Sequence, residues 1–326
     1  MKVTLYAVTV VVLVLLTMPL AVEAQPAGKV WRIGVLFGIA GPESPRAAPF
    51  REGLRELGYV EGQNIAFEWR LSGGQAERFP DLAAELVRLK VDVIVAGDNP
   101  AIAAAQRATS TIPIVMVLAM DPVRTGFVGS LARPGGNITG LSVQATEVQG
   151  KALQLLKDAV PTASRVAVLW DPTEPGRRVQ ATEAESAARA LGLEVHLREA
   201  RSSAELDSLF TAMARERVDA VLVHPSQMLG CHRARLAALA AQSRLPTMGP
   251  SWWAEAGGLM TYGARDIDLF RRAAYYVDKL LRGTKAADLP VEQPMKFELI
   301  INLQTAKTLG LTIPPARLFQ ADKVIQ

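Results

Sequence analysis

The chain has 326 residues, of which 49% are hydrophobic and 21% are charged, with 25 glycines and 20 prolines. This composition is typical of a packed globular protein and excludes a disordered, collagen-like or coiled-coil chain, and the length predicts two domains. The formal net charge of +4 is spread along the chain, which argues against a nucleic-acid-binding protein, because such proteins present a basic face. The single cysteine, Cys231, excludes an intramolecular disulfide and any metal site built from several cysteines.

The N-terminal segment has the parts of a secretory signal peptide. A short basic start, Met1-Lys2, is followed by an apolar run at residues 8–16, and Ala24 offers a small residue at the cleavage position. An uncleaved membrane anchor is the alternative, but the run is shorter than the roughly 20 residues that a spanning helix needs. We therefore predict a signal peptide at residues 1–24 and a periplasmic or otherwise extracytoplasmic location.

The first half of the remaining chain alternates short apolar runs, rich in β-branched residues, with segments of helical period. Strands are expected at Trp31–Phe37, Ile65–Arg70, Val91–Ala96 and Ile114–Leu118. Helices are expected at Phe50–Leu57, Phe79–Lys90 and Ala101–Ala108. Alternation of this kind predicts parallel strands that are covered on both faces by helices, which is the α/β class.

The second half repeats this scheme. Strands are expected at Arg165–Trp170, Glu194–Arg198, Val218–Val223, Pro246–Gly249 and Leu259–Tyr262. Helices are expected at Val179–Leu191, Ser202–Arg215 and Arg233–Gln242. Unrelated βαβ units share this periodicity, so the repeat does not establish a common ancestry. The two sets nevertheless predict two similar Rossmann-like lobes with parallel sheets, joined by a hinge.

A glycine-rich segment at residues 131–140 separates the two sets and has the composition of a crossover. Gly135-Gly136 could alternatively cradle a phosphate, but the Lys-Ser/Thr pair of a P-loop is missing. The expected crossovers are residues 133–140, 257–263 and 291–299. The expected division is an N-terminal lobe at 25–137, to which 264–293 return, and a C-terminal lobe at 138–263, to which 294–326 return.

Polar side chains follow the expected strands, and ligands of open parallel sheets bind at the carboxyl ends of strands. Amide and hydroxyl groups there can donate hydrogen bonds to a ligand carboxylate, whereas carboxylates can accept from an amine. The candidate ligand-binding residues are Asp98, Asn99, Asp121, Asp171, Ser226, Gln227, Ser251 and Tyr262. Of these, Asn99, Asp121, Ser226 and Ser251 are expected within one cleft. Helix capping or turn formation is the structural alternative for the aspartates and Asn99.

Two neighbouring aromatic residues, Trp252 and Trp253, can either stack on a flat ligand or pack in the core. No Gly-x-Ser-x-Gly elbow, His-Glu-x-x-His motif or dinucleotide-binding glycine pattern is present. The three histidines lack the spacing of zinc ligands, and a buried or idle thiol is expected at Cys231. We therefore expect no catalytic residue, no metal site and no cofactor.

Several stretches resemble the substrate-binding components of bacterial ABC importers, in the family that includes tryptophan-binding members. The stretches are residues 50–59, Asp98-Asn99-Pro100, 111–115, 121–123, 130–140 and 301–310. The resemblance implies a type I periplasmic binding protein fold, in which two α/β lobes close over a ligand. It also implies that Asp98, Asn99 and Asp121 contact the ligand.

One position departs from the family, whose members often carry Gly-Thr where this chain has Gly97-Asp98. An acidic residue here suits a ligand with an amine or hydroxyl groups. The expected function is capture of a small polar or aromatic solute and delivery to a membrane ABC permease by a monomeric protein that binds no nucleic acid. A secreted sensor or enzyme on the same fold is the alternative, because a fold alone does not fix function.

Overall fold

The computed structural model describes residues 29–39, 41–143, 145–174 and 177–326. The predicted signal peptide, residues 1–24, lies outside the described residues. Trp31–Gln326 form one compact unit, which contains two β-sheets. None of the helices in the described ranges combines the length and the apolar character that crossing a membrane requires.

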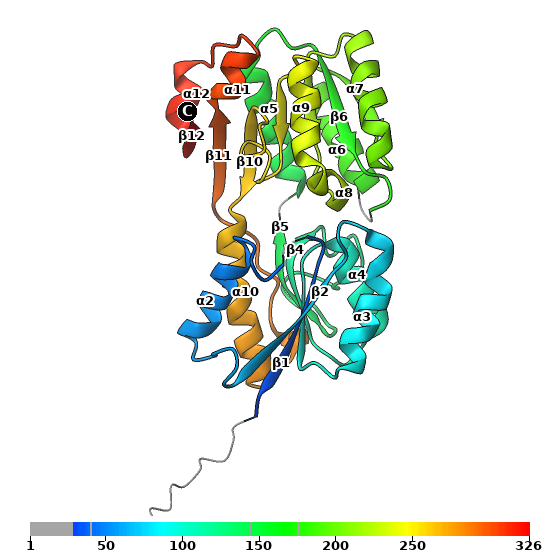
Figure 1. Cartoon of the computed structure of the whole chain (residues 1–326), viewed down its shortest axis with the longest axis vertical. Helices are drawn as coiled ribbons and strands as arrows, with labels where there is room; N and C mark the ends of the chain where they lie inside the picture. Colours follow the sequence, from blue (N-terminus) through cyan, green and yellow to red (C-terminus); the bar gives the residue numbers. More distant parts are fainter. Residues whose placement is uncertain (1–28, 40, 144, 175–176) are drawn as a thin grey trace, which may run out of the picture. The chain divides into compact units, whose positions relative to one another are not determined.

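The first sheet has five strands in the order β2-β1-β3-β4-β5, and all of its pairs are parallel. The strands are β1 (Trp31–Phe37), β2 (Ile65–Leu71), β3 (Val93–Ala96), β4 (Ile114–Met120) and β5 (Ile138–Val143). Helices cover both faces because the buried strands are apolar on both sides. These helices are α2 (Ala47–Glu56), α3 (Phe79–Arg88), α4 (Asn99–Ala108) and α10 (Asp266–Leu281), with the short η1 (Ala76–Arg78) and η3 (Ala286–Asp288). Helices α2 and α10 pack on one face, and α3 and α4 pack on the other (Figure 1).

The second sheet has seven strands in the order β12-β11-β10-β9-β8-β6-β7. The strands are β6 (Arg165–Trp170), β7 (Glu194–Glu199), β8 (Ala220–Val223), β9 (Thr247–Gly249), β10 (Met260–Ala264), β11 (Phe297–Asn302) and β12 (Lys323–Ile325). Only the β10–β11 pair among these is antiparallel. The sheet therefore has a parallel centre, and β11 brings the returning chain to it in the opposite direction.

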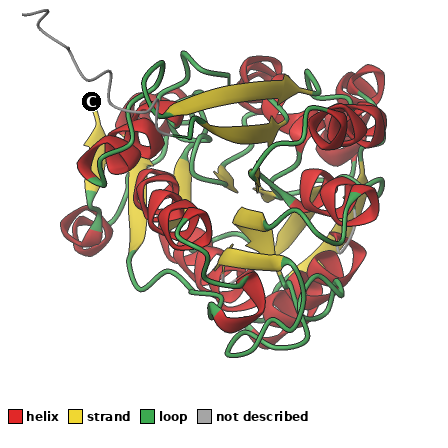
Figure 2. Ribbon diagram, turned by 90° about the horizontal axis from the view of Figure 1, so that it is seen from below, coloured by secondary structure: helices red, strands yellow, loops and turns green. Residues whose placement is uncertain are grey.

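Helices also cover both faces of the second sheet. Figure 2 shows the molecule from below, with helices around much of its strand-rich centre. The helices are α5 (Ala145–Ala159), α6 (Arg177–Ala190), α7 (Leu206–Arg215), α8 (Gln227–Cys231), α9 (Arg233–Gln242), α11 (Leu303–Thr308) and α12 (Pro315–Gln320), with η2 (Ser203–Glu205). Helices α5 and α6 share one apolar cluster, whereas α7 and α9 share another. The predicted α/β class, with two lobes built on mainly parallel sheets, is confirmed.

The chain passes between the two sheets three times: after Val143, at Arg265, and between Glu292 and Phe297. Strand β5 pairs with β4, so the first crossing lies after the boundary that the sequence placed between residues 137 and 138. The glycine-rich segment at 131–140 instead leads into β5 within the first sheet. Gly140 has a φ of +126°, and a Cβ there would lie 2.3 Å from the carbonyl oxygen of Met116, so this glycine is required for strand packing.

We propose that the first lobe comprises residues 31–143 and 266–292 and that the second comprises 145–264 and 297–326. Helix α10 supports this division because it packs on α2 and on the first sheet. Strands β11 and β12 support it because they extend the second sheet. This proposed division has the same two returning segments as the sequence prediction, with ends that differ by up to three residues, and it moves the first boundary from residue 137 to residue 143.

Candidate functional site

A cavity of about 220 Å³ lies between the two lobes. Its walls come from the carboxyl ends of β1, β3, β4 and β5 in the first sheet and of β8 and β9 in the second. Parallel strands of a sheet end on the same edge, so loops that are far apart in the sequence converge there. The cavity therefore has the location that the sequence predicted for a ligand site.

Aromatic and aliphatic side chains form much of the cavity wall. Tyr262 and Phe297 stack with ring centroids 6.0 Å apart and an interplanar angle of 24°. Phe37 and Phe270 meet edge to face, with centroids 5.4 Å apart. Flat aromatic surfaces from both lobes therefore border the cavity, which suits a ligand with an apolar ring.

Asp98 lies at the cavity where β3 leads into α4. Its Oδ1 accepts a hydrogen bond from the Ala101 backbone N–H and caps the helix. Its Oδ2 accepts a 2.6 Å hydrogen bond from Nε2 of Gln227. Burial, together with the negative charge of Glu174, raises the pKa of Asp98 to about 6. The cavity thus contains a carboxylate whose ionised form is destabilised by its surroundings.

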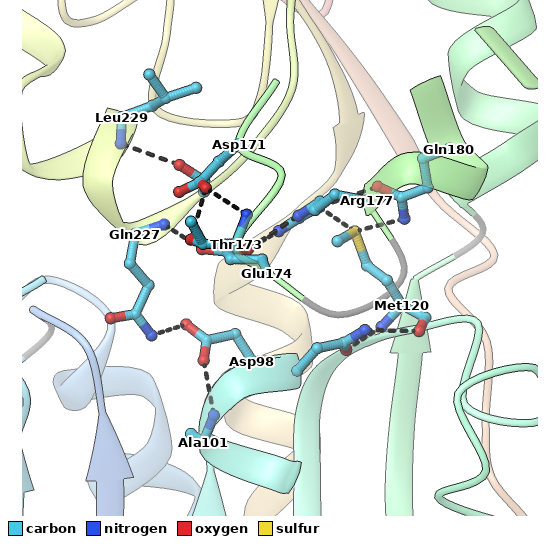
Figure 3. A network of polar contacts seen from close by, with 12 residues as sticks. Asp98, Ala101, Met120, Asp171, Thr173, Glu174, Arg177, Gln180, Gln227 and Leu229 are labelled. Carbon is cyan, nitrogen blue, oxygen red and sulfur yellow. Dashed lines mark hydrogen bonds and ion pairs between the residues drawn. The ribbon is translucent and has the colours of Figure 1, made fainter. Parts of the chain in front are cut away.

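Gln227 connects the two lobes through its side chain. It extends from the start of α8 in the second lobe, and Figure 3 shows its amide directed at Asp98 in the first. Its Oε1 accepts a 3.0 Å hydrogen bond from the hydroxyl of Ser72, also in the first lobe. Ser226, the preceding residue, caps α8 by accepting from the Leu229 N–H. Both residues line the cavity, and the Gln227 side chain forms hydrogen bonds between the lobes at the edge of the cavity.

A buried ion pair lies beside this contact. Nη2 of Arg177 is 2.7 Å from Oε2 of Glu174, and both side chains are buried. Arg177 also donates to Oε1 of Gln180 and to the sulfur of Met120, which belongs to the first lobe (Figure 3). The other carboxylate oxygen of Glu174 accepts from the backbone N–H of Gln227. The pair is hydrogen-bonded on several sides, as a buried charge pair must be.

A second ion pair borders the cavity at α10. Nη2 of Arg46 lies 2.6 Å from Oδ2 of Asp266. Ser251, at the end of β9, donates to the same carboxylate oxygen at 2.7 Å. Ser251 of the second lobe is therefore joined to α10 of the first.

Two buried polar side chains in the cavity wall have atoms without a hydrogen-bond partner among the described residues. Neither ring nitrogen of His224 has one, and neither does Oε1 of Gln149. Burial and the nearby positive charge of Arg177 lower the pKa of His224 to about 3, so its imidazole is neutral at physiological pH. Because an unpaired buried polar group is costly, both side chains are suited to bind a ligand.

The cavity includes five of the eight candidate residues: Asp98, Ser226, Gln227, Ser251 and Tyr262. Asn99, Asp121 and Asp171 are not among the residues of the described chain that line it. Both ends of the Asn99 amide bind the backbone of Met120. Asp171 accepts from the N–H and hydroxyl of Thr173 and forms a turn. Of the four residues expected in one cleft, Ser226 and Ser251 line this cavity, whereas Asn99 and Asp121 are not among its lining residues in the described chain.

Asp121 adopts a left-handed backbone conformation, with a φ of +47°, directly after β4. Burial and the charge of Glu183 raise its pKa, and its backbone oxygen accepts from Thr125. Aspartate tolerates this conformation better than most residues, which gives it a local structural role.

The two neighbouring tryptophans have different environments. Trp253 is fully buried, and its indole N–H donates to the hydroxyl of Thr247 at 2.8 Å. Trp252 lines the cavity. Trp253 is thus part of the core, whereas Trp252 is available to a ligand.

Sequence reasoning missed several cavity residues: Arg46, Gln149, Glu174, Arg177, His224, Asp266 and Phe297. His224 directly follows β8, and Glu174 follows β6, so the strand-end rule could have identified both. Phe297 begins the antiparallel strand β11, and its location has no signal in the sequence.

No group of three or more His, Cys, Asp or Glu side chains within the described ranges is arranged to hold a metal ion. The two lobes, the cavity between them and its mixed aromatic and polar wall define a two-lobed solute-binding protein of the type I periplasmic binding protein fold. The family model described as ABC transporter substrate binding protein matches residues 33–325. The chain therefore belongs to the ABC transporter substrate-binding protein family.

Relatives support this assignment. The chain is 26% identical over 281 residues to a tyrosine-binding protein from Clostridioides difficile (strain R20291), a match that covers 86% of this chain and 81% of the relative. A conserved domain protein from Vibrio cholerae has a similar structure, with a TM-score of 0.84 and 28% identity over 91% of this chain and 100% of the other. An ABC domain from Streptococcus pneumonia in complex with L-Trp gives a TM-score of 0.83 and 27% identity, with the same coverage.

Proposed function

We propose that this protein is the extracytoplasmic solute receptor of an ABC importer, that it binds a small aromatic solute of the amino-acid type in the interlobe cavity, and that it delivers this solute unchanged to a membrane permease. The observation that carries the proposal is a cavity whose aromatic and polar walls come from both lobes. The relatives support the solute class, because one is a tyrosine-binding protein and another was solved with L-Trp. Export through the predicted signal peptide and function as a monomer complete the proposal.

Five of the residues predicted from the sequence, together with His224, are proposed to contact the solute. Tyr262 stacks on the ring, while Asp98, Ser226, Gln227 and Ser251 bind its polar groups. Since they belong to both lobes, one molecule that touches all of them favours the closed arrangement over an open one. Transport needs release as well as capture, so we expect a dissociation constant on the order of 1 μM, which corresponds to a standard free energy of binding of about −8 kcal/mol.

A secreted enzyme is the second candidate, because the raised pKa of Asp98 is a property that catalytic acids share. The sequence, however, contains no Gly-x-Ser-x-Gly elbow and no His-Glu-x-x-His motif. Binding is therefore favoured. Recovery of a chemically altered solute after incubation with the pure protein would support the enzyme instead.

A thermal-shift screen against aromatic amino acids, other amino acids, sugars, aromatic acids and purines tests the proposal. A ligand at 100 times its dissociation constant should add about 2.7 kcal/mol to stability, which raises Tm measurably.

Replacing Tyr262 by alanine should weaken binding of the aromatic ligand about tenfold, because the stacking surface next to Phe297 is lost. Tyr275→Ala is the control, since Tyr275 lies on α10 outside the residues that line the cavity. Shifts with sugars or purines alone would exclude the proposed solute class.

Replacing His224 by leucine should weaken solute binding without lowering the stability of the unliganded protein. The solute loses a hydrogen-bonding partner, so we expect about tenfold weaker binding. The unliganded protein loses a buried imidazole whose nitrogens have no partner in the described structure, so its stability should stay the same or rise by about 1 kcal/mol. Calorimetric titration and thermal melts measure the two quantities, with His232→Leu as the control. A variant that is less stable but binds the solute as before would show that His224 has only a packing role.

A further inference from the structure

We infer that this cavity selects its solute by a primary ammonium group that binds the carboxylate of Asp98, and that a carboxylate on the solute is dispensable, so that primary arylalkylamines are ligands as well as aromatic amino acids. This inference rests on the proposed function and specifies the chemistry of the same site. The evidence for the inference is the set of charged side chains that line the cavity and the partner of each of them.

Five charged side chains line the cavity within the described residues: Arg46, Asp98, Glu174, Arg177 and Asp266. Arg46 is paired with Asp266 at 2.6 Å, and Arg177 is paired with Glu174 at 2.7 Å. Within the part of the chain that the structure describes, Asp98 receives hydrogen bonds only from an uncharged amide and a backbone N–H. The lining charges therefore sum to one uncompensated negative charge, and it belongs to Asp98.

Asp98 retains the capacity to bind a cation. An ionised carboxylate offers about four acceptor sites, and the contacts to Ala101 and Gln227 occupy two of them. A solute ammonium would add a charge-assisted hydrogen bond in a partly buried setting, where such bonds are stronger than neutral ones. The raised pKa of Asp98 agrees with this, because a bound cation would offset the burial and the charge of Glu174 that raise it.

A solute carboxylate finds no comparable position. Helix starts attract anions, but those at the cavity are already occupied. The side chains of Asp98 and Ser226 cap α4 and α8, and α10 begins with the acidic Asp266. The two arginines of the wall are already paired with carboxylates. The unpartnered groups that remain, on His224 and Gln149, are uncharged. A carboxylate would therefore receive only neutral contacts, and it would be repelled by Asp98.

Calorimetric titration at pH 7.5 with two matched series tests the inference. One series is L-tyrosine, tyramine and 3-(4-hydroxyphenyl)propionate, and the other is L-tryptophan, tryptamine and 3-indolepropionate. In at least one series, the amine should bind within about tenfold of the amino acid, whereas the acid that lacks the ammonium group should bind at least 100-fold more weakly. An acid that binds as tightly as its amine, or an amino acid that binds while its amine does not, would overturn the inference and leave the proposed function standing. If no compound of either series binds, the proposed aromatic solute class itself is contradicted.

Asp98→Asn is the matching variant, because asparagine is an equally good N-cap and removes the charge. Its amide nitrogen replaces the oxygen that accepts from Gln227, and a turn of the Gln227 amide, with the Ser72 hydroxyl as acceptor, restores that hydrogen bond. It should weaken binding of the amine at least tenfold, and thermal melts should show a folded protein. Asp81→Asn is the control, since it removes an equivalent charge from the first turn of α3 in the same lobe but away from the cavity. Unchanged amine affinity in Asp98→Asn would overturn the inference. Should that variant not fold, weaker amine binding to the unmutated protein below pH 6 gives the same test, and a flat pH profile would overturn it.

Discussion

Replacing Arg177 by methionine is expected to lower the free energy of unfolding by about 3–5 kcal/mol, because it leaves the Glu174 carboxylate buried without its cation. Arg177 forms two hydrogen bonds to Oε2 of Glu174, one through Nε and one through Nη2. It also contacts Met120 across the lobes, so the variant should hold the two lobes together less well. Urea unfolding followed by circular dichroism, together with solute titration, measures both effects.

The double variant Arg177→Met/Glu174→Gln is the control for this prediction. Glutamine keeps an acceptor for the Gln227 backbone N–H and removes the charge, so the double variant should recover part of the lost stability. Equal stability of Arg177→Met and the unmutated protein would show that the ion pair contributes nothing to the fold. A double variant less stable than either single variant would show that the two side chains do not act as a charge pair.

Asp98 should make the unliganded protein less stable as the pH rises from about 4 to about 6. Its pKa is about 6 in the folded protein, against an ordinary value of 3.8, so in this range the folded state holds a proton that the unfolded state has lost. The stabilising contribution is complete below the unfolded pKa and is lost as the pH passes through the folded pKa. Glu174 and Arg177 are the charged groups that act on Asp98, and the negative charge of Glu174 raises its pKa.

Asp98→Asn removes this titration and keeps the helix cap. We expect it to be more stable than the unmutated protein by about 1–3 kcal/mol at pH 7 and equally stable near pH 4. Denaturant unfolding at both pH values, without solute, checks the difference, and Asp81→Asn is again the control. A difference that does not change with pH would mean that Asp98 has an ordinary pKa. Higher stability combined with weaker solute binding would identify Asp98 as a residue kept for function at a cost in stability.

Local patterns in the sequence located the central strands of both sheets. The runs at Trp31–Phe37, Arg165–Trp170 and Val218–Val223 lie in or overlap strands β1, β6 and β8. A buried parallel strand must be apolar on both faces, and this requirement is visible in any window of the sequence. The first crossing between the sheets was predicted at the glycines of residues 131–140, but the strand that follows them joins the first sheet. Glycine permits a turn in many settings, so its presence does not indicate which sheet the next strand joins.

The sequence by itself thus determined the α/β class, the two-lobe organisation and the edge of the sheets at which the candidate ligand-binding side chains gather. Only the tertiary structure decided which of those side chains share the cavity: Gln227 reaches Asp98 from the other lobe, whereas the neighbouring Asn99 is used by the Met120 backbone. It also placed Phe297 against Tyr262 through the antiparallel return of β11. The physical reason is that the spacing of apolar residues along a strand or helix reflects which of its faces is buried, and this spacing can be read locally. The partners of a side chain at the end of a strand instead depend on how elements far apart in the sequence pack together.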